Sequence, residues 1–323
     1  MTTFTETELR ALMAKAVREV RATNPLAPSI TNTVTQSFVA NAQLAVGGSA
    51  AMVYLPDEGE AVAQASGATY INLGTLLPIY EETIPRTAQA LAAAGKPWVL
   101  DPVGIGIGSL RSQLLRQVQP CKPALVRANA SEVIALASLW GLDVDRTAAC
   151  NDAQPGAADA ATDESQTPGS TAAGDTNDKP VSAEAAADAP SAGPRGVDAT
   201  DSVDAAEAAA AAIARFTGGA VAVSGPIDLV TDGTTAVRLT GGSPLMERIT
   251  GAGCSLGGVA AVFCCVANPF VAALAATAAY NVAGTRAAAR SDAPGSFQVA
   301  FLDELYHLTP EDVADAPLKL EAR

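Results

Sequence analysis

Short apolar runs alternate with alanine-rich segments along most of this 323-residue chain. The runs have the length of β-strands, and the segments between them, such as Thr83–Ala94, have helix-forming composition. This alternation predicts parallel βαβ units, with helices covering both faces of one sheet. We therefore predict an α/β fold. The expected strands are Ala51–Leu55, Thr69–Leu73, Trp98–Leu100, Ala124–Val126 and Ala220–Ser224, with a strand pair in Asp228–Leu239 that turns at Asp232-Gly233.

Helices are also expected near both ends of the chain. Residues 5–22 place Leu9, Met13 and Val17 at helical spacing, and Pro25 ends this amphipathic helix. The other expected helices are Ala205–Phe216, about Ser255–Val266, and one that follows Pro269 and runs to about Arg290.

Residues 146–196 differ in composition from the rest of the chain. They are rich in Ala, Asp, Ser, Thr, Gly and Pro, and between 151 and 196 eight acids stand against two bases. Such a segment cannot bury enough apolar area to offset the entropy of ordering. We predict a disordered acidic insertion in a surface loop, with a partner-binding segment as the alternative. Residues 1–145 and 197–323 show the same alternation of predicted strands and helices and are predicted to form a single domain.

Composition argues against several classes of partner. With a net charge of −14 and 4% aromatic residues, the chain would repel phosphates and offer few stacking platforms, so no nucleic-acid partner is expected. No run of about 18 uncharged apolar residues predicts a membrane span, and the N-terminus does not resemble a signal peptide. The five cysteines form no C-x-x-C pair, which argues against a disulfide framework or a structural zinc site. A reducing cytoplasm is the expected compartment.

A glycine-rich run, Thr250-Gly251-Ala252-Gly253-Cys254, precedes one of the expected helices. Glycines let the backbone approach a ligand, and the N–H groups and dipole of a helix start attract anions. A phosphoryl group in transfer spreads negative charge over its oxygens, so this run suits its stabilisation. The helix start is also expected to lower the pKa of Cys254, which would favour a thiolate able to accept a hydroxyl proton. A glycine-rich helix start beneath a buried cysteine is the alternative.

Polar side chains follow two of the expected strands. Asp101 comes directly after Trp98–Leu100, and Glu132 lies in a helix start just after another strand. Two acids at such strand ends can organise Mg²⁺ through water and phosphate oxygens. Arg127, beside them, can pair with a phosphate or be an ordinary surface cation. For Glu132 the alternative is a capping box with Asn129, three residues earlier.

Other catalytic motifs are missing. No G-x-x-x-x-G-K-[ST] occurs, and Gly104-Ile105-Gly106-Ile107-Gly108 lacks the G-x-G-x-x-G spacing of a dinucleotide site. His307 is the only histidine, which argues against a Ser-His-Asp hydrolase and a histidine metal site. Cys264 and Cys265 lie in an apolar helical run and are expected to pack in the core.

Seven stretches in order resemble the hydroxyethylthiazole kinase family of the ribokinase-like superfamily, over roughly residues 24–145 and 197–300. They are Ser29-Ile30-Thr31-Asn32 with Ala40-Asn41, Gly48-Ser49-Ala50-Ala51-Met52, Asn72-Leu73-Gly74-Thr75, Leu100-Asp101-Pro102-Val103-Gly104, Arg127-Ala128-Asn129-Ala130-Ser131-Glu132, Thr250 to Cys254, and Pro294-Gly295-Ser296-Phe297-Gln298. Ala50 and Ala128 depart from the family pattern, in place of a proline and a glycine, and the 146–196 insertion is foreign to it.

The resemblance implies a three-layer α/β/α fold and ATP-dependent phosphorylation of the primary alcohol of 4-methyl-5-(2-hydroxyethyl)thiazole in thiamine salvage. It also implies Mg²⁺ as cofactor and a homotrimer with active sites at subunit interfaces. The roles it implies are thiazole binding for Met52, Asn32 and Gly251; ATP binding for Arg127, Ser224, Asn129 and Thr250; Mg²⁺ binding for Asp101 and Glu132; an anion hole from Gly251, Ala252 and Gly253; and a base or anion-hole position for Cys254.

Three other functions compete with this one. Another ribokinase-like kinase would act on hydroxymethylpyrimidine, but Met52 and Cys254 argue against it. A ligand-binding trimer without activity would not need Asp101, Glu132, Arg127 and the glycine run together. A hydro-lyase of the same fold, repairing a nucleotide cofactor, would require Asp at position 254.

Overall fold

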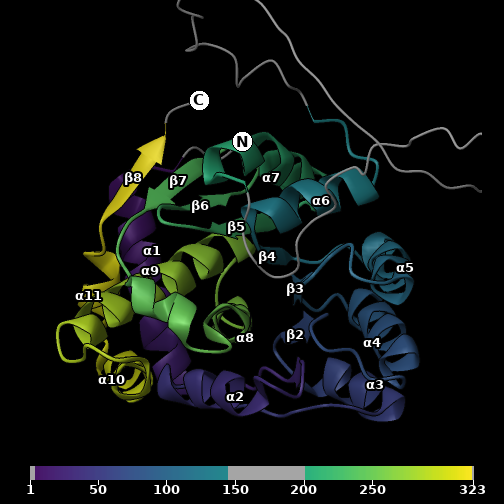
Figure 1. The fold of residues 1–323 in the computed structure, drawn as a ribbon, viewed down its shortest axis with the longest axis horizontal. Coiled ribbons are helices and arrows are strands. Elements are labelled where there is room, and N and C mark those ends of the chain that lie inside the picture. The colour runs from purple at the N-terminus through teal and green to yellow at the C-terminus, as the bar shows by residue number, and fades with distance from the viewer. Residues whose placement is uncertain (1–3, 145–200, 322–323) are drawn as a thin grey trace, which may run out of the picture.

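The computed structural model describes residues 4–144 and 201–321. The strands in these ranges form one sheet, in which they lie side by side in chain order (Figure 1). The strands are β1 (Ser29–Ile30), β2 (Thr69–Asn72), β3 (Trp98–Asp101), β4 (Leu125–Asn129), β5 (Ala220–Ser224), β6 (Asp228–Thr231), β7 (Ala236–Leu239) and β8 (Leu318–Glu321). Neighbours from β1 to β5 are parallel, and those from β5 to β8 are antiparallel. The predicted parallel βαβ core is confirmed, with an antiparallel extension at one edge.

Two sets of helices cover the two faces of this sheet (Figure 1). On one face lie α1 (Glu6–Thr23), α2 (Gln36–Ala45), α8 (Ala252–Cys264), α9 (Pro269–Ala288), α10 (Pro294–His307) and α11 (Pro310–Ala314). On the other lie α3 (Pro56–Ala65), α4 (Tyr80–Ala94), α5 (Ser109–Val118), α6 (Ala130–Leu139) and α7 (Val203–Thr217). Short 3₁₀ turns follow at η1 (Gln119–Cys121) and η3 (Pro244–Arg248). The architecture is therefore the expected three-layer α/β/α arrangement.

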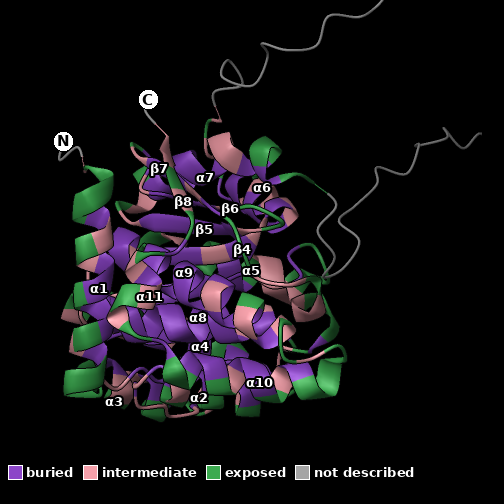
Figure 2. Cartoon of the chain, turned by 90° about the vertical axis from the view of Figure 1, so that its left-hand side faces the viewer, coloured by how far each residue is buried: buried purple, intermediate pink, exposed green. Residues whose placement is uncertain are grey.

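The strands are apolar on both sides because each side meets a layer of helices. Along β2, Tyr70 belongs to the core under α8 and Ile71 to the core under α3 and α4; Val99 and Leu100 of β3 divide in the same way. Figure 2 shows buried residues along the sheet and the inner helix faces, with exposed residues on the outside. The strand period of two thus assigns each strand residue to one of the two cores.

One predicted strand is wrong. Ala51–Leu55 is an extended segment with a single bridge between Met52 and Ser29, not a strand of the sheet. Ser29 donates its N–H to the Ala51 carbonyl at 2.8 Å, and Val53 donates to the Ser29 carbonyl at 3.0 Å. The ladder cannot extend because β1 has two residues and because Pro56 begins α3 directly afterwards.

The other predicted elements agree with the structure to within a few residues. The N-terminal helix expected at 5–22 is α1, and the helix expected from about Ser255 begins three residues earlier, at Ala252. The predicted insertion at 146–196 lies outside the described residues. No helix within 4–144 or 201–321 combines the length and the apolar character needed to cross a membrane.

Candidate active site

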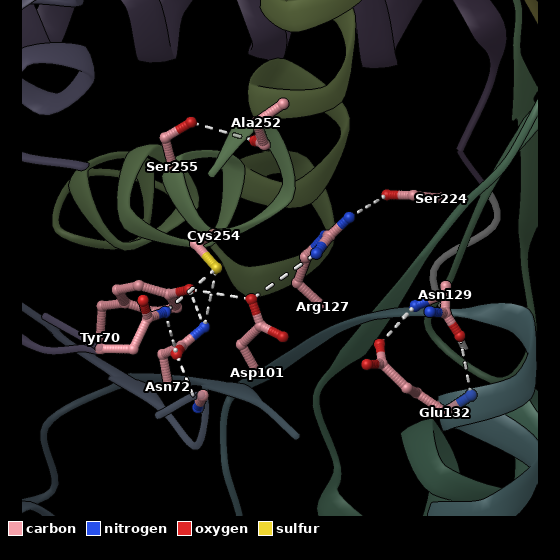
Figure 3. A network of polar contacts seen from close by, with 12 residues as sticks. Tyr70, Asn72, Asp101, Arg127, Asn129, Glu132, Ser224, Ala252, Cys254 and Ser255 are labelled. Atoms are coloured by element: carbon pink, nitrogen blue, oxygen red, sulfur yellow. Dashed lines mark hydrogen bonds and ion pairs between the residues drawn. The ribbon is translucent and has the colours of Figure 1, made fainter. Parts of the chain in front are cut away.

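Four polar side chains from neighbouring strands gather beneath the start of α8 (Figure 3). Asn72 ends β2 and pairs in register with Asp101 at the end of β3. Leu100 of β3 pairs with Val126 of β4. The residues that follow them, Asp101 and Arg127, therefore lie next to each other on the same face of the sheet. Ser224 ends β5. All four lie on the side of the sheet that α8 covers, at the carboxyl ends of parallel strands, where ligands of such sheets bind.

The first turn of α8 lies against this group of side chains, with Gly253 next to Arg127 and Cys254 next to Asn72. Gly251 is the N-cap residue, with a φ of +93° that favours glycine, and no side chain caps this helix end. The first N–H groups of a helix have no partner within the helix and carry its positive dipole end. A Cβ at Gly251 would come within 2.9 Å of the Thr35 side chain. The start of α8 thus has the uncapped backbone that the predicted anion site requires.

Arg127 lies directly against this helix start. A Cβ at Gly253 would come within 2.5 Å of its Nη1 atom. Its Nη2 donates a hydrogen bond to Ser224 Oγ at 3.0 Å, and Nη1 is 3.6 Å from Asp101 Oδ2. Burial opposes its charge, but the carboxylates of Asp101 and Glu132 outweigh burial and raise the pKa of Arg127. The guanidinium, 12% exposed, is not an ordinary surface cation.

Asp101 is a fully buried carboxyl. Its Oδ2 accepts a hydrogen bond from Tyr70 Oη at 2.8 Å, whereas its Oδ1 has no hydrogen-bond partner. Burial raises the pKa of Asp101 to about 6, against the opposing effect of Arg127. Burial and the nearby Asp101 charge also raise the pKa of Tyr70 well above its usual value, so the phenol stays a proton donor.

Cys254 lies in the first turn of α8, in contact with two asparagine side chains. Asn72 Nδ2 is 3.4 Å and Asn32 Nδ2 3.5 Å from its Sγ. We expected the helix start to lower its pKa, and this expectation is wrong. Burial first, and then the Asp101 carboxylate, raise the pKa of Cys254. The thiol form therefore dominates at neutral pH.

Glu132 has the structural role that the sequence left open. It forms a capping box with Asn129: Asn129 Oδ1 accepts from the Glu132 N–H at 2.9 Å, and Glu132 Oε2 accepts from the Asn129 N–H at 3.0 Å. Its other oxygen, Oε1, accepts from the N–H of Gly104 at 3.1 Å. Glu132 thus ties the loop after Asp101 to the start of α6.

The two carboxylates of the site, Asp101 and Glu132, differ in their fit to Mg²⁺. Within 4–144 and 201–321, no three His, Cys, Asp or Glu side chains come together as metal ligands. Mg²⁺ usually keeps several waters and takes one or two carboxylates plus substrate phosphates, so such a cluster is not required. The unpartnered, buried Oδ1 of Asp101 fits a ligand of this kind. Glu132 already accepts two backbone N–H groups and fits a supporting position.

Of the residues expected to bind the thiazole, Asn32 contacts Cys254 and Gly251 caps the same helix, whereas Met52 lies on a separate segment. Asn32 is buried in the polar network, where its Nδ2 also donates to Asn72 Oδ1 at 3.1 Å. Met52 is half-buried on the extended segment beside Ser29. A cavity of about 380 Å³ adjoins the glycine run on the side of α2, η3 and α10, with Thr250 on its wall. Met52, Asn32 and Cys254 do not line that cavity, which is formed by Val34, Ser37, Phe38, Asn41, Arg248, Ile249, Thr250, Pro294, Gly295, Gln298 and Leu302.

Sequence reasoning assigned no role to two residues of this network, Tyr70 and Asn72, although Asn72 belongs to the stretch Asn72-Leu73-Gly74-Thr75 that it named. Asn72 Nδ2 donates to Tyr70 Oη at 2.8 Å, and its Oδ1 accepts from the N–H of Gly74 at 2.9 Å. The signal was available for both, since Asn72 pairs with Asp101 at a strand end and Tyr70 stands two residues earlier, on the same face. Because the strand was interpreted as an apolar run, the hydrogen bonds of the Tyr70 hydroxyl were not expected.

The chain is similar to known proteins over nearly its whole length. A model of the hydroxyethylthiazole kinase family matches residues 17–167 and 183–311, so only 168–182 of the expected insertion lies outside the match. The hydroxyethylthiazole kinase of Bifidobacterium adolescentis is 49% identical over 308 residues, which are 95% of this chain and 93% of that protein.

Solved structures share the fold. The hydroxyethylthiazole kinase protein from Pyrococcus horikoshii OT3 matches with a TM-score of 0.74 at 24% identity, over 97% of this chain and 100% of that one. The pyridoxal kinase from Staphylococcus aureus in complex with ADP matches with a TM-score of 0.52 at 15% identity, over 81% and 88%. The fold is ribokinase-like, as expected. From the family match and the identity over nearly its whole length, the chain belongs to the hydroxyethylthiazole kinase family.

Proposed function

We propose that the chain transfers the γ-phosphoryl group of ATP to the hydroxyl of 4-methyl-5-(2-hydroxyethyl)thiazole, a step of thiamine salvage. The observation that carries this proposal is the contact between Arg127 and Gly253, which puts a buried guanidinium beside an uncapped helix start. The Arg127 guanidinium and the start of α8 thus both contribute positive potential at the place where they meet. Membership of the hydroxyethylthiazole kinase family supports the choice of reaction and substrate.

The helix start and Arg127 stabilise the phosphoryl group in transfer. In this proposal the backbone N–H groups of Gly251, Ala252 and Gly253 donate hydrogen bonds to its oxygens, on which negative charge develops. They are fixed before the reaction and need no reorganisation. Arg127 holds the ATP phosphates, and Ser224 orients its guanidinium through the 3.0 Å hydrogen bond. Asn129 and Thr250 complete the ATP side of the proposed site.

Mg²⁺ is the proposed cofactor, with Asp101 as its protein ligand and Glu132 as support. When bound, the cation neutralises charge on the phosphates. The free Oδ1 of Asp101 supplies the ligand atom, and Glu132 fixes the loop that follows Asp101 through the N–H of Gly104. Breaking the capping box would therefore weaken this side of the site without removing its ligand.

Cys254 is the proposed acceptor of the hydroxyl proton. Its raised pKa leaves little thiolate at neutral pH, so most of the acceleration would come from the backbone amides and, with Mg²⁺ bound, from the charge it would neutralise. The two amide groups of Asn32 and Asn72 point at Sγ and favour the thiolate once it forms. In this proposal Cys254 contributes a modest share of the rate.

The thiazole ring is proposed to lie between Asn32, Met52 and Gly251. Met52 is half-buried, so part of its side chain remains open to a second subunit that would close the pocket. We therefore propose a homotrimer with active sites at its interfaces. Light scattering of the purified chain should give three times the 32.4 kDa chain mass, and a monomer would contradict this assembly. ATP as donor fits a cytoplasmic protein.

A steady-state assay tests the proposed reaction. Purified protein is incubated with ATP and Mg²⁺ and either the thiazole alcohol or hydroxymethylpyrimidine, and ADP release and the phosphorylated product are measured. We expect a higher kcat/KM for the thiazole alcohol. Preference for the pyrimidine would overturn the substrate, and calorimetric binding of the thiazole without turnover would overturn catalysis in favour of a binding protein.

A further inference from the structure

Tyr70 fills the space beneath the first two turns of α8. Its ring is fully buried and packs against Gly257, where a Cβ would come within 2.4 Å of the ring atom Cε2. The glycine, one turn after Cys254, therefore makes room for the aromatic ring. This packing fixes the position of the phenol oxygen between Asn72 and Asp101 (Figure 3).

The hydrogen bonds around Tyr70 determine the direction of its proton. The Gly74 N–H is a donor, so the Asn72 atom that it contacts at 2.9 Å must be the carbonyl oxygen Oδ1. The other atom of that amide is then the NH₂ group, which donates to Tyr70 Oη at 2.8 Å. Tyr70 Oη accepts this bond and can use its own proton only toward Asp101 Oδ2, also at 2.8 Å.

The two oxygens of the Asp101 carboxylate therefore have different surroundings. Oδ2 of Asp101 accepts the hydrogen bond from the Tyr70 hydroxyl and lies 3.6 Å from Arg127 Nη1, whereas Oδ1 has no hydrogen-bond partner. In the view of Figure 3, Oδ1 points away from Tyr70, toward the side on which Glu132 lies. The carboxylate is thus held by one oxygen and presents the other.

We propose that Tyr70 is a positioning residue, which holds the Asp101 carboxylate in the orientation that presents Oδ1 to the metal–nucleotide. This inference rests on the proposed function, since it gives Asp101 the role of metal ligand. Rotation about the Cβ–Cγ bond of Asp101 would turn Oδ1 away, and the Tyr70 hydrogen bond opposes that rotation. Tyr70 touches no reacting atom in this proposal and acts only through Asp101.

The test replaces Tyr70 with phenylalanine, which keeps the ring against Gly257 and removes only the hydroxyl. A hydrogen bond to a charged group contributes enough to change an equilibrium about tenfold or more. For Tyr70→Phe we expect a fall of about that size in kcat, a comparable rise in the Mg²⁺ concentration needed for half-maximal rate, and little change in KM for the thiazole alcohol. A purely structural role would not produce this split.

Tyr80→Phe is the matched control. Tyr80 is also fully buried, and its hydroxyl donates one hydrogen bond, to the Thr31 carbonyl at 3.0 Å. Both variants lose one buried hydroxyl, so both are expected to unfold at a slightly lower temperature. Only Tyr70→Phe should change the Mg²⁺ dependence. Equal kinetics for the two variants would overturn the proposal.

A binding measurement separates this inference from the proposed reaction. Binding of Mn²⁺–ADP, followed by the electron paramagnetic resonance signal of free Mn²⁺, is expected to weaken about tenfold in Tyr70→Phe and to be unchanged in Tyr80→Phe. If the wild-type chain phosphorylates neither alcohol but this difference remains, the reaction is wrong and the positioning role stands. Unchanged binding in Tyr70→Phe, or no binding by the wild-type chain, overturns the positioning role.

Discussion

The guanidinium of Arg127 packs so closely on Gly253 that a Cβ at this glycine would lie 2.5 Å from Nη1 and 2.8 Å from Nη2. Arg127 comes from β4 and Gly253 from α8, two elements separated by more than a hundred residues. Their contact joins the cation of one strand end to the amides of a helix start. It is the structural basis of the proposed phosphate site.

Substitution of Gly253 by alanine should therefore lower the activity more than the stability of the fold. The added methyl group displaces the guanidinium, so we expect kcat/KM for ATP to fall by at least tenfold. Gly95→Ala is the control, because Gly95 has a φ of +62° but nothing within 4 Å of an added Cβ. It should lower the melting temperature slightly and leave the kinetics unchanged. Equal kinetic effects of the two variants would contradict this account.

Asp101→Asn is expected to abolish turnover and to stabilise the fold at pH 7.5. The raised pKa of Asp101, about 6, means that the folded state penalises the ionised carboxyl. A difference of about two pH units corresponds to a few kcal/mol, on the order of 2–3. The penalty is complete above about pH 6 and absent below about pH 4, where the carboxyl is protonated in both states. An asparagine resembles the protonated form.

Thermal unfolding without Mg²⁺ or nucleotide measures this effect. At pH 7.5 the melting temperature of Asp101→Asn should exceed that of the wild-type chain by several degrees, and the gap should close as the pH approaches 4. A variant that is less stable than the wild-type chain at pH 7.5 would show that the Arg127 attraction outweighs burial.

Cys254→Ala should lower kcat and leave the affinity for the thiazole alcohol nearly unchanged. The expected loss is modest, because the raised pKa leaves little thiolate at neutral pH. If Cys254 is the base, the wild-type rate should rise with pH toward the thiol pKa, and the variant should lack this rise. Cys121→Ala, a half-buried cysteine of η1, is the control. Identical rates and pH profiles for Cys254→Ala and the wild-type chain would remove the base role.

Tyr70 and Gly257 should be energetically coupled. Gly257→Ala brings a methyl group to 2.4 Å from the Tyr70 ring, and overpacking of this kind costs about 1–3 kcal/mol. In a Tyr70→Leu background the ring is absent, so the same alanine should cost less. Urea unfolding of the two single variants and the double variant measures the coupling, for which we expect at least about 1 kcal/mol. Additive losses would mean that α8 shifts freely over the ring.

Deletion of residues 151–195 should leave folding and catalysis nearly intact. The composition of this segment provides little apolar surface for a core, and a shorter surface loop has a small effect on stability. Melting temperature, light scattering and kcat of the shortened chain measure the effect. Loss of the assembly or of activity would assign the segment a structural task.

Much of the fold could be predicted because its signals are local. The strands at Thr69, Trp98 and Ala220 are apolar runs between turn residues, and the long helices follow from periodicity and from Pro269. Ala51–Leu55 had the same apolar character but lacked a partner strand of sufficient length. The final strand, β8, was not predicted, since Leu318–Glu321 becomes a strand only by pairing with β7.

The candidate site divides in a similar way. The glycine run and the acids at strand ends could be recognised from residue type and order. The capping box of Glu132 also follows from its spacing to Asn129. The hydrogen bonds of Tyr70 were missed although its place in the strand indicated the right face. The raised pKa of Cys254 could not be predicted, because it depends on which groups surround the thiol.

The sequence by itself determined the layered architecture and the residues able to carry the chemistry, because strand and helix periods and glycine conformations act over a few neighbouring residues. The tertiary structure decided that Tyr70, Asp101, Arg127 and Cys254 meet at one point. Strand register sets the first three on one face, and α8 returns from far along the chain to cover them. Burial under that helix then fixed their charge states, since the free energy of an ionised group depends on its surroundings and not on its place in the chain.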